Sequence, residues 1–108
     1  MNRILLTQLG KGKKAWSQDN TTISYNENTE TYDVFLHGNK IASIDYDNRE
    51  VRLSSCGWRT NTTKSRLNTI LTALRADGGI RQVRKRWQIY TNDYNDHYNF
   101  YDGFEVSF

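Results

Sequence analysis

The sequence predicts an α+β fold in which one amphipathic helix covers one face of an antiparallel sheet. Three observations predict it: strand-like runs with short turns precede residue 55, one helical apolar stripe follows, and strand-like runs return after residue 79. Strands joined by turns of a few residues pair in antiparallel fashion, because parallel neighbours need a long crossover. We therefore expect a meander, then a helix, then a C-terminal hairpin and a final strand.

The length and composition set limits on the class of protein. The 108 residues are about the length of one domain, so we expect 1–108 to form a single α+β domain with one core. The lone Cys56 excludes an intramolecular disulfide, and with His37 and His97 it cannot assemble a Cys/His zinc set. The N-terminal apolar run is too short for a secretory signal, and no apolar stretch is long enough for a membrane span. We expect a cytoplasmic protein with no membrane partner.

The first half of the chain predicts a four-stranded meander. After a short apolar segment at 4–9 and a basic glycine loop, strands are expected at 21–25, 31–36, 40–46 and 51–54. Gly38-Asn39 is expected to form a two-residue hairpin turn, because both residues tolerate positive φ.

A helix is expected at about 61–76. Its apolar residues fall at i, i+3, i+4 and i+7, on one stripe that predicts burial: Leu67, Ile70, Leu71 and Leu74. Asn61 or Thr62 is expected as the N-cap, since their side-chain oxygens can accept from free N–H groups of the first turn. Asp77-Gly78-Gly79 is expected to end the helix, because glycine readily takes the left-handed conformation.

Beyond the helix, two strands at 80–83 and 87–91 are expected around a tip formed by Arg84-Lys85-Arg86. One continuous strand is the alternative, but three adjacent cations suit a solvated turn better. A polar loop is expected at 92–97, and Phe100 or the segment 103–108 should close the sheet.

Charge is distributed unevenly along the chain. The formal net charge is +3, but residues 51–90 hold nine cations and one carboxylate, whereas residues 21–50 hold two cations and six carboxylates. The basic block is typical of an electrostatic footprint for a polyanion. The alternative is that its cations pair with the acidic segments on neighbouring strands.

The basic block supplies the candidate partner-binding residues. They are Arg59, Lys64, Arg66, Arg75, Arg81, Arg84, Lys85 and Arg86. Helical spacing places Lys64, Asn68 and Arg75 opposite the leucine stripe, on a polar face open to a partner. At the helix start, Thr60, Thr62 and Thr63 form a candidate anion site, with simple helix capping as the alternative.

Two tryptophans near this block are candidates for stacking on nucleic-acid bases. Trp58 and Trp87 carry the flat apolar rings that single-stranded nucleic acids use as platforms. Because Trp is highly buried on average, however, we expect both to be core or sheet-face residues.

Catalytic, metal and cofactor chemistry is not expected. Asp93, Asp96, His97 and Asp102 form an acidic cluster that favours a structural turn, because a calcium loop starting at Asp93 would need glycine at Tyr98 and glutamate at Phe104. A metal-dependent nuclease is the remote alternative. Cys56 is expected to be a buried or half-buried thiol. No nucleophile elbow, zinc-protease or dinucleotide fingerprint occurs, so we expect no enzyme activity and no cofactor.

The segment 53–68 carries the pattern GW-x-T-x-T-T-K-x-R-x-N, and it is followed by Gly79-Ile80-Arg81-Gln82, by Trp87 and by an Asp-Gly pair at 102–103. With these motifs the chain resembles, over about residues 31–108, a group of small uncharacterised bacteriophage proteins. The resemblance implies a phage accessory gene that acts in the host cytoplasm, and it implies no catalytic residues.

Small phage proteins of this kind are often antagonists of host defence, anti-CRISPR proteins included, or nucleic-acid-binding proteins. Many such antagonists are acidic DNA mimics, and the basic block of this chain departs from that pattern. The expected partner is therefore nucleic acid or a host nucleoprotein complex. A protein-interaction or structural module that forms a homo-oligomer through an exposed sheet edge is the alternative.

Overall fold

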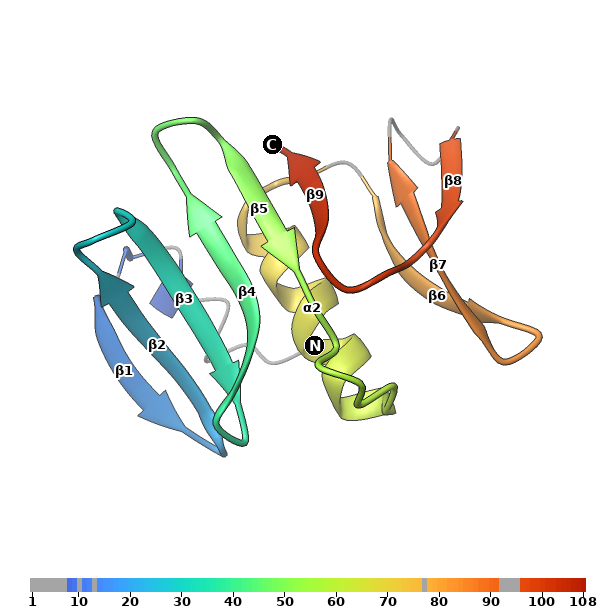
Figure 1. Cartoon of the computed structure of the whole chain (residues 1–108), viewed down its shortest axis with the longest axis horizontal. Coiled ribbons are helices and arrows are strands. Elements are labelled where there is room, and N and C mark those ends of the chain that lie inside the picture. The colour runs from blue at the N-terminus through green and yellow to red at the C-terminus, as the bar shows by residue number, and fades with distance from the viewer. Residues whose placement is uncertain (1–7, 10, 13, 77, 92–95) are drawn as a thin grey trace.

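The computed structural model describes residues 8–9, 11–12, 14–76, 78–91 and 96–108. Figure 1 shows the element order. The elements are β1 (Ala15–Gln18), β2 (Thr21–Asn26), β3 (Thr31–Leu36), β4 (Asn39–Asp45), β5 (Glu50–Leu53), α2 (Asn61–Ala73), β6 (Gly79–Val83), β7 (Arg86–Thr91), β8 (Asp96–Asn99) and β9 (Phe104–Ser107). The predicted α+β class, with one helix packed on antiparallel sheet, is confirmed.

The strands form two sheets where the sequence predicted one. The first sheet has six strands in the order β1-β2-β3-β4-β5-β9, and the second has three in the order β6-β7-β8. All neighbouring strands are antiparallel. The C-terminal hairpin therefore stands apart from the meander, and only the final strand, β9, returns to pair with β5 (Figure 1).

An amide side chain on the helix pairs with the outer edge of β6. Asn68 accepts a hydrogen bond from the N–H of Ile80 at 2.7 Å and donates one to the C=O of Ile80 at 2.9 Å. Its amide thus occupies backbone groups at the edge of β6 as a neighbouring strand would. The prediction that Asn68 lies on an open polar face of the helix is therefore wrong, because its side chain is turned toward the hairpin.

One hydrophobic core lies between the helix and both sheets. The leucine stripe is buried as predicted, and it packs with inward residues of the first sheet, such as Val51 and Leu53, and of the second, such as Ile89. On β5 these buried residues alternate with exposed Glu50 and Arg52, as expected for a strand with one face in the core.

The helix ends differ from the predicted ones. The N-cap is Thr60, whose hydroxyl accepts from the N–H of Thr63 at 3.2 Å, where Asn61 or Thr62 was expected. The helix stops at Ala73, three residues before the predicted end, and Arg75 takes the left-handed conformation with φ of 55°. Arg75 rather than a glycine therefore makes the reversal, and Asp77 lies outside the described residues.

Gly78 has a different structural task. Its φ is +132°, and a Cβ built there would lie 1.7 Å from the carbonyl oxygen of Tyr90. Only a residue without a side chain lets the chain pass this close to β7.

Several strand boundaries and turns also differ from those expected. The turn between β3 and β4 is His37-Gly38, with φ of 52° and 79°, so that Asn39 already pairs with Leu36. The sequence did not predict β1 or β8, and the loop expected at 92–97 contains the start of β8. Gln8 and Leu9 are helical, and the rest of the expected element at 4–9 lies outside the described residues.

Candidate nucleic-acid interface

The β6–β7 hairpin ends in a two-residue turn made of Arg84 and Lys85. Val83 pairs with Arg86, and the two turn residues have φ of 50° and 67°, in the left-handed region. Residues other than glycine cost about 1 to 2 kcal/mol each in this region. The hairpin therefore holds two long cationic side chains at its tip despite a backbone that favours Asn-Gly there.

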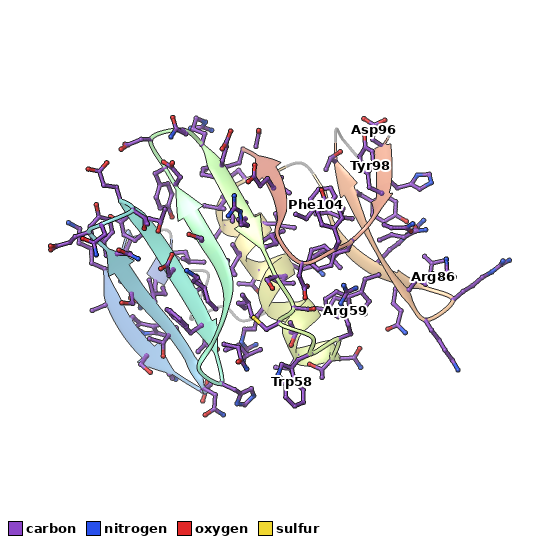
Figure 2. All side chains as sticks on the ribbon, viewed as in Figure 1. Trp58, Arg59, Arg86, Asp96, Tyr98 and Phe104 are labelled. Atoms are coloured by element: carbon purple, nitrogen blue, oxygen red, sulfur yellow. The ribbon has the colours of Figure 1, made fainter. Side chains whose placement is uncertain are left out.

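The hairpin cations are Arg81, Arg84, Lys85 and Arg86, and all four are exposed. Figure 2 shows Arg86 at the side of the molecule, next to the hairpin tip. Among the described residues, no carboxylate lies within 4.0 Å of any of these four cations. The predicted alternative pairs these cations with Asp93, Asp96 or Glu105. It is wrong for Glu105, which forms an ion pair with Arg52 at 2.6 Å. Asp96 lies on β8 and is one of the described carboxylates with which these cations form no ion pair, and Asp93 lies outside the described residues.

One hairpin cation also lies against an aromatic ring. The guanidinium carbon of Arg81 is 4.0 Å from the ring centre of Tyr90 on β7. This cation–π contact orients Arg81 on the sheet face while leaving its side chain accessible.

Arg59, predicted as a partner-binding cation, is held mainly by the protein itself. Its guanidinium carbon is 5.0 Å from the ring centres of both Trp87 and Phe100, and its Nε donates to the Ser55 hydroxyl at 2.9 Å. Its Nη2 is 3.9 Å from a carboxylate oxygen of Asp102. About 40% of its side chain stays exposed, so part of its charge still reaches solvent.

Asp102 fastens the C-terminal Asp-Gly turn to the segment before the helix. Its carboxylate accepts from the backbone N–H of Ser55 at 2.8 Å and from the Ser55 hydroxyl at 2.7 Å. Burial alone would raise the pKa of Asp102, but the Ser55 hydrogen bonds, the Arg59 charge and the Gly57 N–H together hold this pKa below its usual value. The motif residues thus meet in a structural network.

The remaining predicted cations lie on or just after the helix, in different environments. Arg66 donates from Nε to the hydroxyl of buried Thr21 at 3.0 Å, which ties the helix to β2. Lys64 lies in the first turns of α2, and exposed Arg75 follows its end. The helix between Lys64 and its end at Ala73 is about 14 Å long.

The predicted anion site at the helix start is partly used by capping. The Thr60 hydroxyl accepts from the Thr63 N–H and also pairs with the Thr63 hydroxyl at 3.0 Å. Thr62 is exposed. All three threonines line a cavity of about 490 Å³, which Trp58 also borders.

The two candidate stacking tryptophans have opposite environments. Trp87 is 4% exposed and belongs to the core, as expected, whereas Trp58 is 61% exposed and does not. Cys56, expected to be at least half-buried, is exposed in the turn beside Gly57. The neighbouring sequence does not show which tryptophan is buried, because Trp87 packs against Arg59 and Phe100, which are distant in sequence.

The described members of the acidic cluster do not lie in one place. Asp96 and His97 lie on β8, Asp102 bonds Ser55, and Asp93 is outside the described residues. In the part of the chain that the structure describes, no three His, Cys, Asp or Glu side chains gather as metal ligands would. No helix in that part is both long and apolar enough to cross a membrane.

Comparisons with known proteins give one family. A family model described as Kyanoviridae Gp96 protein matches residues 4–107. No curated protein and no solved structure matches the chain.

Proposed function

We propose, from the premise that the chain belongs to the Kyanoviridae Gp96 family, that this phage protein is a nucleic-acid-binding protein without catalytic activity that acts in the host cytoplasm. The observation that supports the proposal is the β6–β7 hairpin, whose four cations have no carboxylate within 4.0 Å among the described residues. Cations that form no internal ion pair can neutralise phosphates and release their counterions.

The shape of the hairpin agrees with this use. A two-stranded ribbon is narrow enough to enter the major groove of a duplex or to lie along a single strand. Three carboxylates of the first sheet lie away from the hairpin tip: the β2–β3 turn holds Glu27 and Glu30, and the β4–β5 turn holds Asp47 (Figure 1). A polyanion is thus attracted by one end and repelled by the other.

Salt dependence tests the proposal. Each neutralised phosphate adds about 0.7 to 0.9 to the slope of log affinity against log salt, so four contacts cost on the order of 10² in affinity between about 50 and 200 mM. Arg84→Gln with Lys85→Gln should lower this slope by about 1.4 to 1.8 for a labelled oligonucleotide. Melting temperature should change little, because exposed charges contribute little to folding.

A charge-matched control separates the hairpin from net charge. Lys11→Gln with Lys14→Gln removes the same two charges from exposed positions before β1, and this variant should keep the parent slope. Equal salt slopes for the parent and the hairpin variant would contradict the proposal, as would an equal decrease of the slope in the hairpin variant and the control variant.

We propose further that the bound nucleic acid belongs to a host nucleoprotein, such as the complexes that anti-CRISPR proteins block. Recovery of nucleoprotein from host lysate by the parent, but not by the hairpin variant or after nuclease treatment, is the expected outcome. Recovery that survives nuclease treatment would point to a protein partner instead.

A protein-interaction role has one observation in its favour, the free edge of β9. The Phe108 N–H donates to the Arg49 C=O at 2.9 Å, and hydrogen-bonded pairs recur at every second residue of an antiparallel ladder. By this alternation, Glu105 and Ser107 turn their backbone groups away from β5, toward a groove of about 510 Å³.

A homodimer formed through this edge should dissociate in the variant Ser107→Pro, because proline removes a backbone donor from the edge strand. Light scattering measures this dissociation. A monomer mass of the parent protein that does not depend on concentration would rule the homodimer out.

A further inference from the structure

A cavity of about 490 Å³ lies where the β3–β4 turn, the Ser55 segment and the start of α2 meet. Leu36 and Ile41 give it an apolar lining, and Trp58 borders it. Small-molecule sites in proteins have volumes of this order and a mainly apolar lining with a few polar groups. The cavity can therefore accommodate one flat ring system and its substituents.

Trp58 is an unusual residue to leave in solvent. It is 61% exposed, although the same chain buries Trp87. Among the described residues, no aromatic ring or cation lies on a face of the Trp58 indole. The exposed indole at the border of the cavity therefore offers a free aromatic face on which a base can stack.

The polar groups around the cavity fit the edge of a nucleobase. Asn39 and Thr62 both line it, and neither side chain makes a hydrogen bond within the described part of the chain. An amide and a hydroxyl offer donors and acceptors together, which is what the edge of an unpaired base requires.

The charge around the cavity favours a ligand attached to phosphates. No Asp or Glu belongs to its lining. Arg59, the next residue after Trp58, contacts Trp87. Trp87 directly follows Arg86, which pairs with Val83 to close the hairpin. In the view of Figure 2, Arg59 lies between Trp58 and Arg86, and about 40% of its side chain is exposed beside its ion pair with Asp102.

We infer that this cavity takes an unpaired nucleobase, stacked on Trp58, from the nucleic acid whose phosphates the hairpin holds. The inference rests on the proposed function and makes it more specific: the bound nucleic acid is single-stranded, or has at least one base outside the helical stack. Stacking on an aromatic side chain contributes about 1 to 3 kcal/mol per base in other proteins, equivalent to about 5- to 150-fold in affinity.

The test compares Trp58→Leu with Trp58→Phe, using a labelled oligothymidine and a duplex of equal length. Trp58→Leu should lower affinity for the single strand by about 5- to 150-fold at constant salt without altering the salt slope. Trp58→Phe should retain most of the affinity, since it keeps an aromatic face, and duplex binding should be the same in both variants. Both variants should melt near the parent temperature, because Trp58 is exposed.

Two outcomes distinguish failure of this inference from failure of the proposed function. If Arg84→Gln with Lys85→Gln lowers the slope but Trp58→Leu leaves single-strand affinity unchanged, the hairpin binds nucleic acid and the base site is wrong. A free nucleoside, which has no phosphate, tests the cavity alone: it should quench the fluorescence of the parent and not of Trp58→Phe. Equal quenching in the two proteins would overturn the inference even if oligonucleotide binding stands.

Discussion

At the scale of single residues, the motif residues act mainly on each other. Asp102 accepts two hydrogen bonds from Ser55, a residue 47 positions earlier in the chain, and Arg59 lies beside both. Together they hold the turn that exposes Trp58 and the turn that leads into β9. Arg59 is therefore a residue that positions the site, and only its exposed part adds to the charge that a polyanion meets.

The lowered pKa of Asp102 predicts how acid affects stability. A carboxyl with a folded pKa below its unfolded value of about 3.9 stabilises the fold fully above that pH, and this stabilisation is lost as pH falls through the folded pKa. Asp102→Asn should cost about 1 kcal/mol at neutral pH, because it removes the charge that Ser55 and Arg59 contact, and solvent screens part of this charge on a side chain that is 40% exposed. Its melting temperature should then fall less steeply than the parent's between about pH 4 and pH 2.

Asp45 provides the control for this prediction. Its pKa is also lowered, by hydrogen bonds from the backbone and side chain of Asn48, but these hydrogen bonds lie at the surface, next to the β4–β5 turn. Asp45→Asn should leave neutral-pH stability nearly unchanged. If Asp102→Asn shows the same acid slope as the parent, the Ser55 network does not supply the pH dependence.

At the scale of elements, the sequence predicted the helix and strands that a periodic pattern of apolar residues or a turn signal marks. The helix was found because its apolar stripe recurs every three or four residues, and β2 to β7 because apolar alternation or turn residues delimit them. Strand β8 has four exposed residues and is held by pairing with β7, so no apolar pattern marks it. Strand β1 was missed for the same reason, because it is short and mostly exposed.

The candidate site was predictable to a similar extent. The cationic hairpin tip could be read from three adjacent charges between two strand-like runs. The internal roles of Arg59, Arg66 and Asn68 could not, because each depends on a residue at least 12 positions away, brought close only by the fold. Exposure of Trp58 is likewise a property of the assembled turn.

The amide of Asn68 gives the element-scale prediction. Asn68→Ala should leave both the N–H and the C=O of Ile80 without their partner, at a cost of about 2 kcal/mol, because partly buried backbone groups are expensive to leave unpaired. Hydrogen exchange at the Ile80 amide should accelerate as β6 loosens from the helix. Urea denaturation and exchange measured on the same variant give both quantities.

Thr72→Ala is the matched control one helical turn further on. Its hydroxyl bonds only the Asn68 carbonyl within the helix and is exposed, so its loss should change stability by less than about 0.5 kcal/mol. Unchanged exchange at Ile80 in Asn68→Ala would contradict the role assigned to the amide.

At the scale of the whole molecule, the two sheets share the helix and one core, although no strand of one pairs with a strand of the other in the described residues. Tight attachment matters for the proposed site, because the Trp58 cavity is built on the first sheet and the helix, whereas the cations stand on the second sheet. A nucleic acid that contacts both needs them held in fixed positions.

Leu71 tests that attachment, since it is almost fully buried in the shared core. Leu71→Ala should destabilise the protein by about 2 to 5 kcal/mol through lost burial and the cavity left behind. We expect this loss to appear equally in both sheets.

Two single-tryptophan variants report on the two sheets by fluorescence: one keeps Trp16 on β1 and the other keeps Trp87 on β7, with phenylalanine at the remaining tryptophan positions. Introducing Leu71→Ala should move the urea midpoints of both reporters together, because one cooperative unit has one transition. A shift in one reporter that the other does not share would show that the sheets unfold separately, and 1–108 would then not behave as the single domain that its length predicts.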